Sequence, residues 1–335
     1  MQYTTLGHTG IRVCRLCLGS VPFGRELDET ASHLVMDHAF ELGINFVDTA
    51  DIYPSEGINE QGRTEGVIGT WLEGKRHQVV LATKVRGRMG NGPNDTGLSR
   101  LHIMHAVEAS LKRLRTDYID LYQVHAVDPL TPVETTLRAL DDLIRQGKVL
   151  AIGCSNYLAW ELCKALWASD VGGLTRFESV QNRYNVLARE IEPELLPLCA
   201  SEQVAVLPYN PLAGGLLTGK YQFGQPHPEG SRFQFESAVN TKRYEDRYWY
   251  KPTLEAVERL KPVAAKAELS LAQYALAWVL ANPAVTSAII GASSTSQLDE
   301  TVKALDRSLT AEEHRAGCEA AAGAVVGPCV GPRGQ

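Results

Sequence analysis

The chain of 335 residues is 44% hydrophobic and 21% charged, which is typical of a globular protein with a substantial core and excludes extensive disorder. Its formal net charge of −6, with no stretch rich in Lys or Arg, excludes the basic surface that nucleic-acid binding requires. No apolar run of roughly 18 residues and no apolar signal core are present, so we expect a cytoplasmic protein without a membrane partner.

The seven cysteines are too few and too irregularly spaced for a disulfide framework, so we expect free thiols. Cys14 and Cys17 form a C-x-x-C pair, but this pair lies in an apolar, strand-like run and no second pair accompanies it. His102 and His105 share a helix face without an evident third ligand. The sequence therefore predicts neither a redox pair nor a metal site.

The first elements in chain order are two short strand-like stretches around the turn-like tetrad 7–10, which predicts a small β-hairpin. Short apolar runs rich in β-branched residues then recur, and helix-length segments with apolar i, i+4 spacing separate them. Eight strands are predicted on this basis, at 16–18, 44–47, 79–82, 119–124, 149–152, 177–180, 204–207 and 288–290.

Strands that alternate with helices indicate parallel βαβ units. The expected fold class is therefore α/β, a (β/α)8 TIM barrel with the N-terminal β-hairpin as a plug in its floor and long loops on its C-terminal face. Two helix starts have the capping-box pattern: Thr131 to Glu134, with proline at the first helical position, and Ser270 to Gln273 without it.

No linker divides the chain, so residues 1–309 are interpreted as one (β/α)8 domain. The longest irregular stretch, about 222–250, follows the seventh strand, and long loops in compact domains are usually functional. Beyond Leu309 the sequence becomes rich in Ala, Gly and Pro. Residues 310–335 are therefore predicted to form a C-terminal tail with a disordered end.

Polar side chains stand where the predicted strands end, and in a parallel barrel these ends share one rim that carries the active site. A single such residue is often structural, but polar residues at six consecutive strand ends are harder to explain that way. The set comprises Asp48 with Tyr53 in the following loop, Lys84, His125, Ser155 with Asn156, Gln181 and Tyr209.

Carbonyl reduction requires hydride delivery to carbon and proton delivery to oxygen. A tyrosine can donate that proton if a neighbouring ammonium group stabilises its phenolate, and Lys84 is suited to do so for Tyr53. Asp48 would keep Lys84 charged and oriented. His125 would donate a hydrogen bond to the substrate oxygen as charge develops there.

One alternative is a phosphate-binding P-loop, because 214–220 fits G-x-x-x-x-G-K. Tyr221 stands where a P-loop needs Ser or Thr to bind magnesium, and the segment follows the seventh strand of a barrel. An NTPase is therefore disfavoured. The chain also has no G-x-G-x-x-G, so a dinucleotide would bind in barrel loops and not in a Rossmann crevice.

The chain resembles the aldo-keto reductase superfamily, in its bacterial and potassium-channel β-subunit-like branch, over nearly its whole length up to about Leu309. The motifs that carry this resemblance are Asn45–Ala50 with Tyr53, Ala82–Lys84, Tyr122–His125, Gly153–Asn156, Gln181–Asn185, Tyr209–Tyr221 and Ile290–Ser294. The resemblance implies a catalytic tetrad of Asp48, Tyr53, Lys84 and His125, with Tyr53 as the acid in reduction, and NADPH/NADP+ as cofactor.

The resemblance also implies the cofactor-binding residues. Ser155, Asn156 and Gln181 would bind the nicotinamide amide, and Tyr209 would stack on its ring. Lys220, Arg232 and Ser293 would surround the 2′-phosphate, an arrangement that favours NADPH over NADH. Thr301 departs from the Asn common at its position. The remaining implied residues are Gly19, Ser20, Asn210, Pro211, Leu212, Gly214 and Gly291, with Gln297 and Glu300 near the adenosine.

The expected partner is a small-molecule carbonyl substrate, with walls from Val21, Arg86 and Trp249. The sequence leaves the physiological carbonyl compound, the stereochemistry and a homo-oligomeric state open. Two alternatives to a general reductase remain: a reductase of nucleotide-linked deoxysugar ketones, and an NADPH-binding regulatory subunit similar to the β subunits of voltage-gated potassium channels. Those subunits usually carry Asn where His125 stands, so His125 favours the enzyme.

Overall fold

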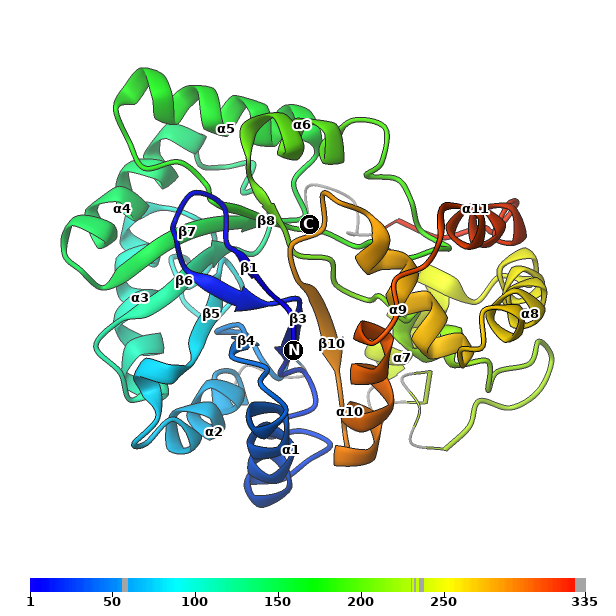
Figure 1. The fold of residues 1–335 in the computed structure, drawn as a ribbon. Helices are drawn as coiled ribbons and strands as arrows, with labels where there is room; N and C mark the ends of the chain where they lie inside the picture. Colours follow the sequence, from blue (N-terminus) through cyan, green and yellow to red (C-terminus); the bar gives the residue numbers. More distant parts are fainter. Residues whose placement is uncertain (56–59, 230, 232, 235–237, 329–335) are drawn as a thin grey trace.

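The computed structural model describes the chain except residues 56–59, 230, 232, 235–237 and 329–335 (Figure 1). Its main sheet is parallel and has eight strands in the order β10-β3-β4-β5-β6-β7-β8-β9. Each of the eight predicted strands is confirmed, with shifts at the ends. The strands are β3 (Leu16–Gly19), β4 (Phe46–Asp48), β5 (Val80–Val85), β6 (Ile119–Val124), β7 (Val149–Ser155), β8 (Ser179–Gln181), β9 (Ala205–Val206) and β10 (Ala288–Gly291).

Backbone hydrogen bonds between the last two strands close the sheet into a barrel. The amide of Thr286 donates to the carbonyl of Val206 at 2.9 Å, and the amide of Ile289 donates to the carbonyl of Pro208 at 2.8 Å. Because β10 also pairs with β3, the sheet has no free edge at this junction. The predicted (β/α)8 barrel is therefore confirmed.

An N-terminal hairpin plugs one end of this barrel. Strands β1 (Tyr3–Thr5) and β2 (Arg12–Cys14) pair antiparallel, and β1 crosses in front of the barrel strands in Figure 1. Leu6 and Val13 are fully buried and pack with the side chains that fill the barrel interior. Those interior residues are Cys17, Phe46, Val80, Ala82, Leu121, Ala151, Ala205, Leu207 and Ile289.

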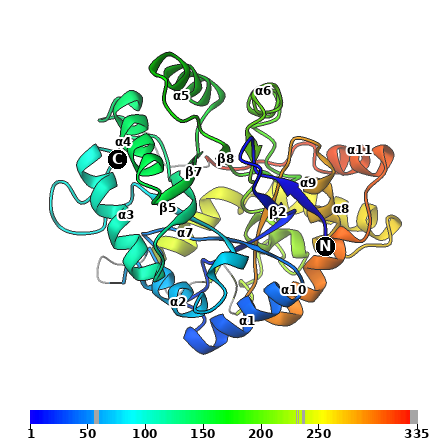
Figure 2. The ribbon, with the colours of Figure 1, turned by 60° about the vertical axis from the view of Figure 1, so that its left-hand side comes forward.

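Helices surround the barrel, as the two ribbon views show (Figures 1 and 2). The α-helices are α1 (Glu29–Glu41), α2 (Arg63–Trp71), α3 (Arg100–Leu114), α4 (Val133–Arg145), α5 (Ala159–Gly172), α6 (Leu195–Glu202), α7 (Ala238–Tyr248), α8 (Lys251–Lys266), α9 (Leu271–Ala281), α10 (Thr295–Val302) and α11 (Ala311–Ala320). Short 3-10 turns are η1 (Arg76–Gln78), η2 (Ala213–Thr218) and η3 (Lys303–Leu305).

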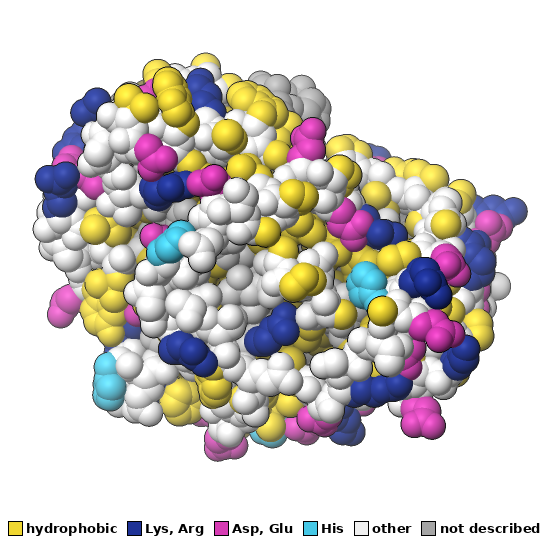
Figure 3. Space-filling model, turned by 45° about the horizontal axis from the view of Figure 1, so that its top comes forward, with side chains coloured by type: hydrophobic (Ala, Val, Ile, Leu, Met, Phe, Trp, Pro, Cys, Tyr) yellow, Lys and Arg dark blue, Asp and Glu magenta, His cyan; other side chains and the backbone are white. Residues whose placement is uncertain are grey.

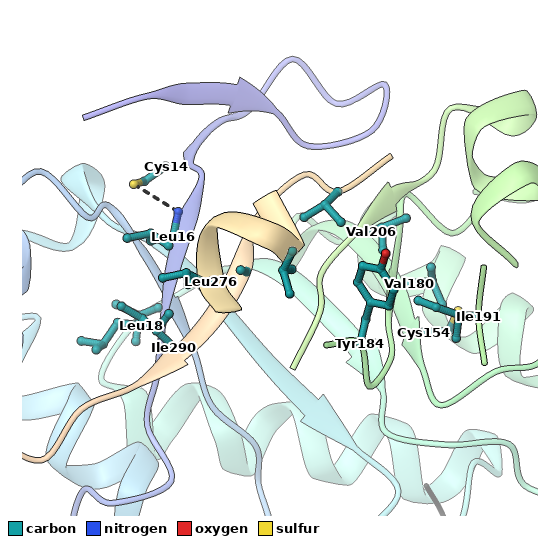
Figure 4. Packing of buried hydrophobic residues seen from close by; sticks show 14 of the residues in the cluster. Cys14, Leu16, Leu18, Cys154, Val180, Tyr184, Ile191, Val206, Leu276 and Ile290 are labelled. Atoms are coloured by element: carbon teal, nitrogen blue, oxygen red, sulfur yellow. Dashed lines mark hydrogen bonds between the residues drawn. The ribbon is translucent and has the colours of Figure 1, made fainter. Parts of the chain in front are cut away.

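The larger core lies between the sheet and the helices. Leu16 and Leu18 belong to this outer core, whereas Cys17 between them belongs to the barrel interior, as the two-residue period of a strand requires. Figure 4 shows Leu16, Leu18 and Ile290 packing beside Leu276 of α9. Cys14 and Cys17 are buried free thiols, and the described residues contain no cluster able to hold a metal ion.

The packed chain continues beyond Leu309, the predicted end of the domain, into α11. Thr310 caps α11 through a capping box with Glu313. Trp278 of α9 donates through Nε1 to the carbonyl of His314, and the two rings stack with centroids 4.7 Å apart. These contacts order residues that composition alone had assigned to a tail; the predicted disordered end, 329–335, lies outside the described residues.

The two predicted capping boxes have different outcomes. Ser270 caps α9 as expected, with Gln273 as its partner. At α4 the prediction is wrong, because Pro132 occupies the N-cap position and makes no side-chain cap. The Thr131 hydroxyl donates instead to the carboxylate of Asp128 in the preceding loop, at 2.8 Å, and so does not cap the helix.

The surface shows no segregation of charge on the face drawn in Figure 3, where Lys and Arg side chains are interspersed with Asp and Glu. This distribution agrees with the absence of a basic stretch in the sequence. Among the helices that the structure describes, none has the length and apolar character needed to cross a membrane.

Candidate active site

Four polar side chains meet at the carboxyl ends of three neighbouring strands. Asp48 ends β4, Tyr53 lies in the loop that follows, Lys84 is near the end of β5 and His125 comes directly after β6. Adjacent parallel strands end at the same rim of the barrel, which brings these residues together despite their separation in sequence.

Lys84 and Asp48 form a buried ion pair. The ammonium of Lys84 donates to Oδ2 of Asp48 at 2.5 Å and to the carbonyl of Thr49 at 2.7 Å, and Lys84 is fully buried. Burial alone would lower the pKa of Lys84, but the negative charges of Asp48 and of an ionised Tyr53, together with the hydrogen bond to Asp48, outweigh it and raise that pKa above its ordinary value. Lys84 therefore stays positively charged inside the barrel.

Two glutamines complete the environment of Asp48. Gln123 and Gln181 both donate to Oδ1, at 3.0 and 2.9 Å, while Oδ2 accepts Lys84. Both carboxylate oxygens are thus satisfied in a buried site. We did not predict Gln123 as a site residue. Its place in β6 two residues before His125, and so on the same face of the strand, was the available signal.

Tyr53 lies beside both other polar groups. The ammonium of Lys84 is 5.5 Å from the centroid of the Tyr53 ring. The rings of Tyr53 and His125 are edge-on, with centroids 6.0 Å apart. Burial, followed by the charges of Lys84, Arg86 and Arg243, lowers the pKa of His125 to about 3. The imidazole is therefore neutral near pH 7 and can donate a hydrogen bond without carrying charge.

A second polar group continues the rim across β7 and β8. The hydroxyl of Ser155 donates to the carbonyl of Gln181 at 2.8 Å. Asn156 has a left-handed backbone, with φ of 60°, and its amide nitrogen donates to the carbonyl of His125 at 2.9 Å. The hydroxyl of Tyr209 donates to Oδ1 of Asn156 at 2.7 Å. Hydrogen bonds thus connect the residues predicted to bind the nicotinamide to His125 at the same rim.

The segment after β9 turns tightly toward η2. Asn210 has a φ of 55°, and its carbonyl accepts the side-chain amide of Asn185 at 2.9 Å. Pro211 is buried and Leu212 half-buried at the start of η2. Gly214 has a φ of 69°, and a Cβ there would come within 2.6 Å of the Tyr244 ring. This position therefore requires glycine both for its backbone and for the close approach of α7.

Beside β9 at the closure of the barrel, β10 and α10 present the residues predicted for the adenosine end. Gly291 is the register partner of Gly19 in β3. Oε1 of Gln297 accepts both the amide of Ser293 at 2.9 Å and its hydroxyl at 3.2 Å, so these two residues are adjacent at the start of α10. Thr301 donates to the carbonyl of Gln297 within the same helix.

The charged residues predicted for the adenosine and 2′-phosphate end, Lys220, Arg232 and Glu300, are not brought together by the described part of the structure. Lys220 is exposed, with its ammonium 5.4 Å from the centroid of the Tyr221 ring. Arg232 lies outside the described residues. Glu300 accepts the hydroxyl of Ser270 at 2.7 Å, which ties α10 to the start of α9. The described residues therefore show Ser293 with Gln297 as a unit, but not the complete predicted phosphate site.

The predicted substrate residues differ in their surroundings. Arg86 follows β5, donates through Nε to the carbonyl of Val127 at 3.0 Å, and is close enough to influence the pKa of His125. Val21 is half-buried after β3. Trp249 packs edge-on against His227, with ring centroids 4.3 Å apart, and against Tyr221. Trp249 thus belongs to an aromatic cluster of the long loop.

Three buried polar atoms follow strand ends at the rim and have no hydrogen-bond partner among the described residues. The hydroxyl oxygens of Ser20 and Thr49 and Oδ1 of Asn182 are buried, and within the described part of the chain they have no hydrogen-bond partner. Ser20 and Thr49 follow β3 and β4, and Asn182 follows β8. Because buried polar groups are normally paired, these atoms fit a polar cofactor or substrate at the mouth.

Comparison with known proteins matches the aldo/keto reductase family model to residues 15–321. An uncharacterized oxidoreductase of Bacillus subtilis is 40% identical over 93% of each chain. A probable voltage-gated potassium channel subunit beta of Arabidopsis thaliana is 38% identical over 91% of this chain and 92% of its own. Versiconal hemiacetal acetate reductase of Aspergillus parasiticus is 32% identical over 93% of this chain and 95% of its own.

Proposed function

The chain belongs to the aldo/keto reductase family, and from this premise we propose that it reduces an aldehyde or ketone to the alcohol with NADPH, using Tyr53 as the general acid. Relatives named as oxidoreductases and as a reductase support an oxidoreductase. The observation that carries the finer proposal is the fully buried Lys84 ammonium, which lies between the Asp48 carboxylate and the ring of Tyr53.

The proton in this mechanism comes from the hydroxyl of Tyr53. As that proton moves to the carbonyl oxygen, the nearby positive charge of Lys84 stabilises the phenolate left behind. Asp48 keeps Lys84 charged and aimed, and its own orientation is fixed by Gln123 and Gln181. The hydride for the carbonyl carbon is the chemistry that the bound cofactor supplies.

His125 acts in this mechanism as a neutral hydrogen-bond donor. Its lowered pKa keeps the imidazole uncharged, so it can orient the carbonyl oxygen without competing with Tyr53 as the acid. The amide of Asn156 holds the backbone of His125 in place through its 2.9 Å bond. Tyr53, beside the Lys84 ammonium, is thus suited to donate the proton, and the buried, neutral His125 is suited to donate a hydrogen bond.

The cofactor would lie across the rim from β7 to β10. Ser155, Asn156 and Gln181 would hold the carboxamide, and Tyr209 would contact the nicotinamide ring. The unpartnered buried oxygens of Ser20 and Asn182 fit a polar ligand there. At the other end, Ser293 precedes the N-terminus of α10, which is suited to a phosphate. Lys220 and Arg232 are proposed to supply the positive charge that distinguishes NADPH from NADH.

The rival function is a regulatory subunit that binds the cofactor without rapid turnover. The similarity to a probable channel subunit beta favours this alternative. His125, in edge contact with Tyr53, favours the enzyme because it provides the donor that carbonyl reduction uses. The substrate class also remains between a general carbonyl reductase and a reductase of nucleotide-linked deoxysugar ketones.

The test mixes purified protein with NADPH and a panel of carbonyl compounds and follows the loss of NADPH absorbance. The panel contains reactive aromatic aldehydes, aliphatic ketones and sugar-nucleotide ketones. We expect saturable turnover with at least one class, and the preferred class identifies the substrate. Tight NADPH binding without turnover across the panel would contradict the enzyme and support the regulatory subunit.

A further inference from the structure

A buried carboxylate outside the barrel lies next to the catalytic strand. Glu65 of α2 is fully buried. Its Oε1 accepts the hydroxyl of Thr83 at 2.6 Å, and its Oε2 accepts Nε of Arg113 from α3 at 2.7 Å. Thr83 directly precedes Lys84 in β5, and alternation along the strand points Thr83 to the helix layer while Lys84 points to the interior. Glu65 is therefore hydrogen-bonded to β5 at the residue next to Lys84.

The same helix also holds the loop that carries the phenol. The backbone carbonyl of Tyr53 accepts the amide of Gly62 at 3.0 Å and the amide of Thr64 at 3.3 Å, at the N-terminus of α2. Thr64 is the residue before Glu65. One turn of α2 thus connects the backbone of Tyr53 to the strand of Lys84.

Arg113 is tightly fitted against this turn. Gly62 has a φ of 85°, and a Cβ there would lie 2.5 Å from Cδ of Arg113. Arg113 also donates through Nη2 to the hydroxyl of Ser110 at 3.2 Å. Because Arg113 of α3 lies against Gly62 while it pairs with the buried Glu65, this ion pair connects the start of α2 to α3.

Two further ionisable side chains, Asp51 and Tyr122, lie near Glu65 and Arg113. Asp51 is fully buried, and within the described residues no side chain donates a hydrogen bond to it; the Tyr122 hydroxyl is also buried and has no partner there. Burial, and then the charge of Glu65, raises the pKa of Asp51 well above its ordinary range. Glu65 is the carboxylate that pairs with Arg113.

We propose that Glu65 is a positioning residue for the reaction, because its bonds to Thr83 and Arg113 set the place of the Tyr53 phenol beside the Lys84 ammonium. This inference rests on the proposed function. Glu65 touches neither the substrate site nor the ammonium, so it acts through the start of α2 and through β5. Loss of its carboxylate would loosen the Tyr53 loop relative to Lys84.

The direction in which the ionisation of the Tyr53 phenol moves along the pH scale distinguishes a positioning role of Glu65 from a simple charge effect. Removing a negative charge near a phenol makes its ionisation easier and moves it to lower pH. Moving the phenol away from the Lys84 ammonium makes ionisation harder and moves it to higher pH. A merely structural role for Glu65 would leave the ionisation of Tyr53 unchanged.

The experiment compares Glu65→Gln with Glu73→Gln as a matched control. Glu73 follows α2 and pairs with Arg115 at the end of α3, but this pair is exposed. We measure kcat, KM and NADPH binding, and we titrate the Tyr53 phenol by ultraviolet difference against the same variant carrying Tyr53→Phe. Glu65→Gln is expected to lower kcat roughly 10- to 100-fold. It should leave NADPH affinity unchanged and move the phenol titration to higher pH, whereas the control should match the unmodified protein.

A second pair of variants covers the case in which Glu65→Gln does not fold. Thr83→Val removes the hydroxyl that Glu65 accepts but keeps the shape, whereas Thr83→Ser keeps the hydroxyl. Thr83→Val should lower kcat and move the phenol titration to higher pH, as Glu65→Gln does. Thr83→Ser should change kcat and the titration less than Thr83→Val.

An unchanged or lower phenol titration in the folded variants would overturn the positioning role even if kcat fell. A chain that reduces no carbonyl compound would instead contradict the proposed function, because the phenol titration needs no turnover. The two failures are therefore distinguishable.

Discussion

Replacing one member of the Asp48–Lys84 pair leaves the other charge buried without its partner. Both side chains are at least nine-tenths buried and are joined at 2.5 Å, so Asp48→Asn or Lys84→Met alone should cost about 3 to 5 kcal/mol of stability. In Asp48→Asn the remaining oxygen can still accept Gln123 and Gln181, which limits the loss to the ion pair. The double variant Asp48→Asn/Lys84→Met contains no buried charge at this pair. Its loss of stability should therefore be much smaller than the sum of the losses in the two single variants.

The predicted shift in melting temperature follows from the size of the chain. For 335 residues the entropy of unfolding is about 0.7 kcal/mol per kelvin, so each single variant should melt about 4 to 7 °C lower. Thermal unfolding followed by circular dichroism, without cofactor, measures all four proteins. Lys242→Met, in an exposed pair with Asp246, serves as the control and should leave the melting temperature unchanged.

Activity and stability should separate in this cycle. The double variant should regain most of the stability but remain inactive, because its neutral side chains cannot stabilise the Tyr53 phenolate. Additive losses of stability in the double variant would refute the reasoning, since they would mean that the two charges do not compensate one another in the folded protein.

Two further predictions concern His125 and the cofactor phosphate. The pKa of His125 is lowered from 6.5 to about 3, so the folded protein resists protonation and this group's contribution to stability, complete above about pH 6.5, is lost as pH falls toward about 3. Urea unfolding measures the free energy of unfolding of His125→Asn and of the unmodified protein. Between about pH 7 and about pH 4 this free energy should fall more in the unmodified protein than in the variant. A difference between the two proteins that does not change with pH would contradict the lowered pKa of His125. Lys220→Ala should raise the KM for NADPH more than the KM for NADH; equal effects on both would remove Lys220 from the 2′-phosphate site.

The fold was predictable because its signal is repeated. Each strand of the barrel is buried on both faces and so reads as a short apolar run, and the helices between them carry a regular apolar stripe. The details that failed depend on individual contacts. Thr131 bonds to Asp128 and not to its own helix, and α11 is ordered by packing on α9, which composition does not encode.

The residues that we propose as catalytic could be predicted to lie together because they stand at strand ends, and the closed barrel brings strand ends together. Glu65 was not predicted, because a glutamate in the first turn of a helix normally favours the helix dipole at the surface. Its burial depends on Arg113, which is distant in sequence. The neutral state of His125 likewise requires knowledge of which cations surround it in three dimensions.

The most direct test of the account is the rate of NADPH-dependent carbonyl reduction by Tyr53→Phe. This change removes one oxygen from a ring that lies 5.5 Å from Lys84 and 6.0 Å from His125. We expect the variant to bind NADPH as tightly as the unmodified protein, measured by quenching of intrinsic fluorescence, and to lose nearly all turnover. A variant that keeps a near-native kcat would show that another group donates the proton.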